Sequence, residues 1–81
     1  MLTIAEKFGK YLRKRRESQQ WTLRQLGRRS NMPHNTIYQI ETGVTDPRVS
    51  QLGKLAKAFG EELSVFVAPA FARRVKETPQ A

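Results

Sequence analysis

The feature that most restricts this chain is a succession of four short apolar patterns with helical spacing, each bounded by a turn signal. Apolar residues recur every three or four positions in the segments that begin near Thr3, Thr22, Pro33 and Pro47. Such patterns predict amphipathic helices that each bury one stripe. With 81 residues and no cysteine, the chain suits one small domain held together by helix packing, oligomerisation or both.

The first two helices carry recognisable boundary signals. Thr3-Ile-Ala-Glu6 has the pattern of a capping box and predicts a helix that runs to about Ser18. A polar turn at residues 19–20 follows it. Thr22 is placed to cap the second helix, and Asn31 suits the left-handed conformation at its end.

The third and fourth helices are bounded by proline and glycine. Pro33 predicts the start of the third helix, and Gly43 ends it. Asp46-Pro47 has the pattern of an N-cap followed by proline in the first turn, so a fourth helix is expected from there to Gly60. This order predicts a mainly α fold.

After Gly60 the apolar period changes from helical spacing to alternation, which predicts a short strand over Leu63–Ala68. Nothing upstream looks like a second strand, so its backbone groups need a partner outside the subunit. We expect the same strand of a second copy to pair with it in an isologous antiparallel ribbon, and a fifth helix is the alternative. A flexible tail is expected at residues 69–81. The residues expected to make the dimer contact through this strand are Leu63, Val65, Phe66 and Val67.

The charge of the chain is strongly positive. Fifteen Lys and Arg against seven Asp and Glu give a net charge of +8, and most of the excess lies in residues 1–31. Such a balance predicts a polyanionic partner, with nucleic acid ahead of an anionic membrane surface. Membrane binding is disfavoured because the apolar stripe of the first helix is needed for the core.

Several other classes are disfavoured by composition. A single histidine and the absence of cysteine exclude the usual Cys/His zinc sites. No nucleophile, base and carboxylate stand at a meaningful spacing, so neither an enzyme nor a cofactor is expected. No secretion signal and no apolar run of about 20 residues is present, and a cytoplasmic, nucleoid-associated protein is expected.

The segment from Trp21 to Leu63 resembles the lambda-repressor/Cro-type helix-turn-helix family, also called XRE. That resemblance implies a four- to five-helix DNA-binding domain over residues 1–68, with the helix-turn-helix at about 22–42 and double-stranded DNA as partner. The residues that carry it are Thr22, Leu26, Thr36-Ile37, Ile40-Glu41-Thr42-Gly43, Pro47, Leu52, Leu55, Ala56 and Gly60.

The resemblance also implies a set of site residues, centred on a third helix that enters the major groove. The base-reading positions fall on His34, Asn35 and Gln39, with Tyr38 beside them, and Asn and Gln can each pair with adenine through two hydrogen bonds. Arg16 and Glu41 match the family's structural ion pair. Leu23 stands where the family commonly has Gln, and Pro33 where it has Ser. The expected phosphate-binding residues are Thr22, Leu23, Arg24, Thr36, Thr42 and Arg48.

Two functions are compatible with these features. The first is a sequence-specific transcriptional regulator, a repressor or autoregulator, that binds an inverted repeat in DNA as a homodimer. The alternative is an antitoxin that binds a toxin protein and represses its own operon. The expected strand at Leu63–Ala68 favours this alternative, because it resembles the C-terminal strand of HipB-type antitoxins.

Overall fold

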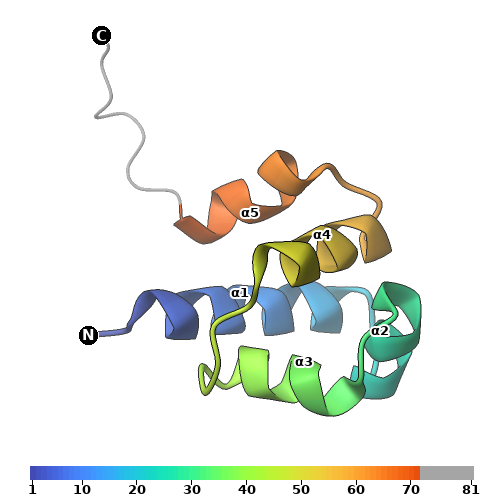
Figure 1. The fold of residues 1–81 in the computed structure, drawn as a ribbon, viewed down its shortest axis with the longest axis horizontal. Helices are drawn as coiled ribbons and strands as arrows, with labels where there is room; N and C mark the ends of the chain where they lie inside the picture. Colours follow the sequence, from blue (N-terminus) through green and yellow to red (C-terminus); the bar gives the residue numbers. More distant parts are fainter. Residues whose placement is uncertain (72–81) are drawn as a thin grey trace, which may run out of the picture.

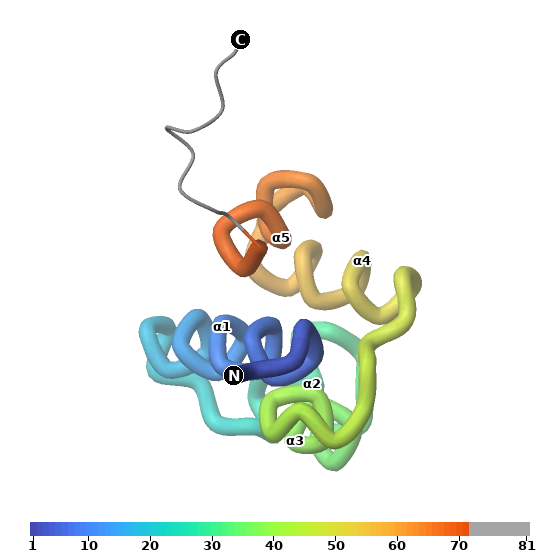
Figure 2. Tube along the Cα trace, turned by 90° about the vertical axis from the view of Figure 1, so that its left-hand side faces the viewer, coloured from blue at the N-terminus to red at the C-terminus, as the bar shows by residue number. Residues whose placement is uncertain are grey.

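The computed structural model describes residues 1–71, which form five helices and no strand, so the predicted mainly α fold is confirmed (Figure 1). In Figure 1, α1 crosses the middle of the molecule, with α2 at its right-hand end, α3 below it, and α4 and α5 above it. The side view in Figure 2 shows the same order, with α1 between the two other pairs. The helices are α1 (Ile4–Ser18), α2 (Leu23–Ser30), α3 (His34–Glu41), α4 (Val49–Ala58) and α5 (Leu63–Phe71).

Local side-chain bonds fix the starts of α1 and α2. Thr3 and Glu6 form the predicted capping box, in which each side chain accepts the other residue's backbone N–H, at 3.0 and 2.8 Å. Thr22 and Gln25 form a second capping box with the same reciprocal bonds. Asn31 adopts the predicted left-handed conformation at the end of α2, with φ of 58°. These ends are therefore set by residues that are near neighbours in the sequence.

The fourth helix starts later than predicted. It begins at Val49 with Arg48 as the N-cap, whereas the sequence pointed to Asp46-Pro47. Gln51 explains the difference, because its side-chain oxygen accepts the backbone N–H of Arg48 at 2.9 Å. That bond satisfies a donor at the helix start, so the boundary falls at Arg48 and residues 42–48 connect α3 to α4.

The core is one apolar cluster to which all five helices contribute. Gly9 brings α1 and α3 together, because a Cβ atom there would collide with the carbonyl oxygen of Ile40 and lie 2.5 Å from that of Glu41. The buried members of the cluster are Phe8, Leu12, Leu26, Met32, Ile37, Ile40, Leu55, Ala56 and Phe66.

The predicted C-terminal strand is wrong, and so is the intersubunit ribbon built on it. Residues Leu63–Phe71 form helix α5, which is the fifth helix that we named as the alternative to a strand. Phe66 is fully buried in the core, while Val65 is 57% exposed. A helix pairs its own backbone groups, so no second strand is needed. Residues 69–71 belong to α5 rather than to a flexible tail, and the rest of the predicted tail, residues 72–81, lies outside the described residues.

The four residues that we assigned to the strand lie partly in the core and partly at the surface. Leu63 and Val67 pack against the core around Phe66, and Val65 faces outward. Apolar residues occupy both the inner and the outer side of α5, so alternation along the sequence masks the helical period. None of the four predicted strand residues therefore pairs through its backbone with another subunit in the way that we expected.

Candidate nucleic-acid interface

Helix α3 has a buried side and an outward side. Ile37, Ile40 and Glu41 are buried against the rest of the fold. His34 is half-buried at the start of the helix, and the helix contains no Lys or Arg. The predicted base-reading residues therefore lie on the outward side of α3, and that side carries no Lys or Arg. The exposed residues on that side are Asn35, Tyr38, Gln39 and, just past the helix, Thr42.

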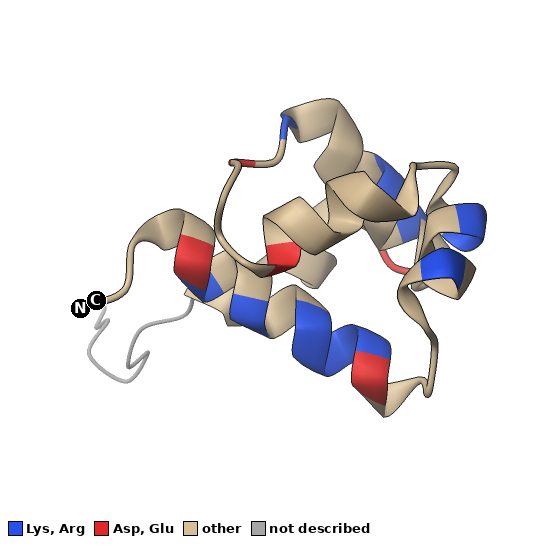
Figure 3. Ribbon diagram, turned by 90° about the horizontal axis from the view of Figure 1, so that it is seen from below, with Lys and Arg blue, Asp and Glu red and all other residues tan. Residues whose placement is uncertain are grey.

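Basic residues surround α3 on the face from which it is accessible. Figure 3 views the molecule from the α3 side and shows Lys and Arg along α1, on α2 and at the start of α4. Such charges hold the phosphate backbone of a nucleic acid, and exposed amide side chains such as those of Asn and Gln can pair with base edges. The arrangement thus combines an exposed polar helix side with a basic border.

The turn between α2 and α3 is tightly packed. The Met32 backbone N–H donates to the carbonyl of Gly27 at 2.9 Å, and the Met32 side chain is buried. A Cβ atom at Gly27 would lie 2.8 Å from the Met32 carbonyl oxygen, so only glycine fits there without a shift. This close contact fixes the angle at which α3 leaves α2, and with it the direction of the outward side of α3.

The predicted phosphate-binding residues lie at the starts of α2 and α4 and along α3. Thr22 caps α2 and accepts the Gln25 N–H at 3.1 Å. The amides of Leu23 and Arg24, in the first turn, have no carbonyl partner within the helix. The Leu23 side chain packs against the core, so only its backbone is available to an anion.

The remaining predicted phosphate-binding residues differ in how accessible their side chains are. Arg48 is exposed at the N-cap of α4. Thr36 is half-buried in the first turn of α3. The Thr42 hydroxyl donates to the carbonyl of Tyr38 at 3.0 Å, which turns its hydrogen inward and leaves its oxygen as an acceptor. Thr42 therefore has to rotate before its hydroxyl can donate to a phosphate.

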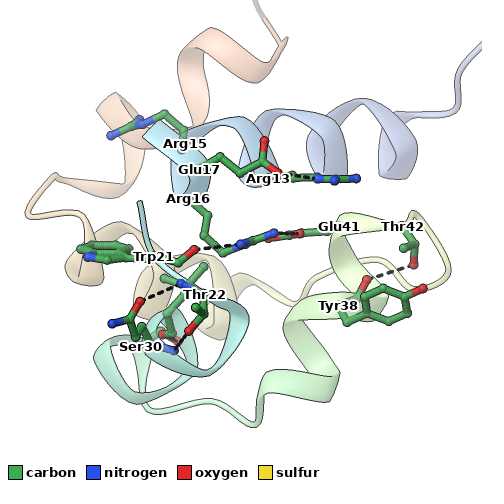
Figure 4. A network of polar contacts seen from close by, with 12 residues as sticks. Arg13, Arg15, Arg16, Glu17, Trp21, Thr22, Ser30, Tyr38, Glu41 and Thr42 are labelled. Carbon is green, nitrogen blue, oxygen red and sulfur yellow. Dashed lines mark hydrogen bonds and ion pairs between the residues drawn. The ribbon is translucent and has the colours of Figure 1, made fainter. Parts of the chain in front are cut away.

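The structure brings Arg16 and Glu41 together in an ion pair with two bonds (Figure 4). Arg16 Nε lies 2.7 Å from one carboxylate oxygen, and Nη2 lies 3.0 Å from the other. Arg16 Nη1 also donates to the carbonyl of Trp21 at 2.8 Å. The hydrogen bond to Glu41 raises the pKa of Arg16 against the opposing effect of burial. The pair therefore ties α1, the end of α3 and the segment before α2.

A second polar cluster, which sequence reasoning missed, attaches α5 to α1. Arg15 donates to both carboxylate oxygens of Glu61, at 3.1 and 2.9 Å, and to the Tyr11 hydroxyl at 2.7 Å. Its guanidinium lies 4.8 Å from the ring centroid of Phe59. The Tyr11 hydroxyl donates in turn to the carbonyl of Phe66. The pKa of Arg15 is raised chiefly by its bond to Glu61.

Two further observations concern residues 1–71 only. Within that range no three His, Asp or Glu side chains are grouped so that they could hold a metal ion. No helix in the described part is long and apolar enough to cross a membrane.

The fold and this surface define a helix-turn-helix domain. Residues 12–66 match the family model described as helix-turn-helix, of the Cro/C1 type also called XRE. This match covers more than half of the chain, and the chain therefore belongs to that family of DNA-binding transcription regulators. Comparisons with curated proteins and with solved structures gave no match.

Proposed function

We propose that this protein is a sequence-specific regulator, a repressor or autoregulator, that binds an inverted repeat in double-stranded DNA as a homodimer. The observation that carries the proposal is the outward side of α3. It is polar, accessible and free of charge, and it is bordered by basic residues of α1, α2 and α4 (Figure 3). A major groove admits one helix of this kind.

Asn35 and Gln39 supply the sequence readout. They lie one turn apart on the exposed side of α3, so both amides face the same groove. Each amide can donate an N–H to adenine N7 and accept the adenine N6–H through its oxygen, which is the pair of groups that adenine offers in the major groove. His34 and Tyr38 lie beside them and contact adjoining bases or sugars.

Phosphate contacts at the ends of α2 and α3 hold α3 in the groove. The first-turn amides of Leu23 and Arg24 lie at the positive end of the α2 dipole, where an anion is favoured. Thr22 and Thr36 add hydroxyl groups, and Arg48 adds an exposed guanidinium at the other end of the site. Thr42 contributes after rotation of its hydroxyl.

The outer side of α5 is the surface through which we propose that two copies associate. Val65 is 57% exposed, and Ala68 and Pro69 are exposed on the same side of the helix. Leu63–Phe71 contains no charged residue, in a chain whose net charge is +8. Two such chains repel each other least at an uncharged apolar surface. A family dimer places its two reading helices about 34 Å apart, one turn of DNA.

The antitoxin hypothesis has lost the observation that favoured it. It rested on a C-terminal strand, and those residues form α5. We therefore propose a homodimer that regulates transcription, and we do not propose a toxin protein as its partner.

Binding as a function of salt tests the proposed DNA interaction. If roughly 5 phosphates are neutralised per subunit, log affinity falls with log salt with a slope of about −0.9 per phosphate. We expect this steep dependence in fluorescence anisotropy with a duplex selected from a random pool. A flat response over about 50–200 mM salt would refute nucleic-acid binding.

Molar mass tests the proposed dimer. In sedimentation equilibrium we expect the protein to be a dimer and Val65→Glu to be largely monomeric, because it introduces a charge into the apolar surface of α5. Val49→Glu is the matched control, since Val49 is a 73% exposed valine on another helix, α4. Equal dimerisation of the two variants would contradict the α5 contact.

A further inference from the structure

The surface has a hollow of about 760 Å³ beside α1 and a second one at the turn between α2 and α3. The second hollow is the one that two arginines of the same helix border. It has a volume of about 630 Å³, and its lining includes Arg24, Arg28, Asn31, Pro33 and His34. Arg24 and Arg28 are exposed and lie one helical turn apart on α2. Two guanidinium groups therefore border the same concave surface.

These two arginines have no ion-pair partner in the part of the chain that the structure describes. Helix α2 itself contains no Asp or Glu. Arg29, the next residue on α2, instead lies over the ring of Trp21, 4.5 Å from its centroid. Like charges four residues apart on a helix repel each other. An anion between Arg24 and Arg28 would remove that repulsion.

The start of α3 adds hydrogen-bond donors to the same hollow. Pro33 is the N-cap and makes no side-chain cap bond. Its carbonyl accepts the N–H groups of Thr36 and Ile37, at 3.0 and 3.3 Å. The amides of His34 and Asn35 precede these and have no carbonyl partner within the helix. Donors and positive charge thus converge from two helices.

We propose that this hollow binds a phosphate group of the DNA backbone, next to the base contacted by His34. The inference rests on the proposed function and adds Arg28, together with the Arg24 side chain, to the DNA contacts. A phosphate held there fixes the start of α3 against one strand and sets how deeply the helix enters the groove.

Removal of one charge at the hollow tests the contact. Arg28→Gln is compared with Lys54→Gln, which removes the same charge from an exposed position on α4 outside the hollow. On the selected duplex we expect Arg28→Gln to reduce the steepness of the salt slope by about 0.9 per subunit and to weaken specific and random DNA alike. Arg28→Lys should retain the slope, because it keeps the charge.

The outcomes separate this inference from the proposed function. If the wild-type protein binds DNA with a steep salt slope and Arg28→Gln changes it no more than Lys54→Gln does, the contact at the hollow is refuted and the function stands. If the wild-type protein shows no salt-dependent binding, both fail. Circular dichroism melting of Arg28→Gln should match the wild type, since the side chain is exposed.

Inorganic phosphate without DNA distinguishes a backbone site from a site for a free anion. We expect phosphate titration to give only weak, non-saturating shifts at the backbone amides of Arg28 and His34 in nuclear magnetic resonance spectra. Saturable phosphate binding that Arg28→Gln abolishes, with an unchanged DNA slope, would overturn the DNA contact and assign the hollow to a free anion.

Discussion

Removal of the Glu41 carboxylate is expected to destabilise the fold strongly. The side chain of Glu41 is 4% exposed and that of Arg16 is 12% exposed, so Glu41→Ala leaves a largely buried cation without its partner. Such a loss costs about 3–5 kcal/mol. Arg16 keeps its bond to the Trp21 carbonyl at 2.8 Å and some access to water, which favours the lower end, about 3 kcal/mol. For a domain of this size that corresponds to a melting temperature lower by about 12–24 °C.

Thermal and urea unfolding followed by circular dichroism measures this effect. Glu17→Ala is the matched control, because Glu17 forms an ion pair with Arg13 at 2.9 Å whose side chains are 55% and 65% exposed. That exposed pair should contribute no more than about 0.5 kcal/mol. If Glu41→Ala and Glu17→Ala lower the melting temperature equally, the account of the buried pair is refuted.

Two further changes probe the packing of α1. Gly9→Ala should lower the free energy of unfolding by about 1–3 kcal/mol, because its new methyl group collides with the Ile40 and Glu41 carbonyls. Gly53→Ala, with open space around it, should raise it by up to about 1 kcal/mol, and urea unfolding that gives both the same sign would contradict this reasoning. Glu61→Gln weakens the bonds from Arg15 and should speed hydrogen exchange in α5, up to about fivefold for ~1 kcal/mol; unchanged exchange would show that α5 is held by apolar packing alone.

The first four helices could be predicted because their signals are local. Thr3 and Glu6 cap α1 through bonds that span three residues, and Asn31 ends α2 by its own conformation. The start of α4 moved to Arg48 because a side chain inside the helix, Gln51, decides the boundary. Local patterns therefore identify a helix more securely than they locate its ends.

The fifth helix could not be predicted from periodicity. A short run that is apolar at nearly every position satisfies both the strand and the helix pattern. Its conformation is decided by tertiary contacts, above all the burial of Phe66 in the core and its place between the rings of Phe8 and Phe59. Phe8 lies on α1 and Phe59 is the C-cap residue of α4, and no spacing in the sequence reveals these partners.

Of the two polar clusters that join helices, one was expected from the sequence and the other was not. Arg16 and Glu41 were expected only because the chain resembles a family that pairs these positions. The cluster of Arg15 with Glu61 and Tyr11 has no such motif, and Arg15 and Glu61 are 46 residues apart. For the predicted DNA contacts, the sequence identified Asn35, Tyr38 and Gln39, which share the exposed side of α3, and their contact with bases stays a prediction.

Selection of bound sequences from random duplexes, with the wild-type protein and with Gln39→Ala, tests the central claim that α3 reads bases in the major groove. We expect the wild type to enrich an inverted repeat whose half-sites lie about 10 base pairs apart. Gln39→Ala should lose about 1–3 kcal/mol of preference at one base pair in each half-site, with its affinity for random DNA nearly unchanged. Failure of the wild type to enrich any sequence, or the same preferences in both proteins, would contradict that claim.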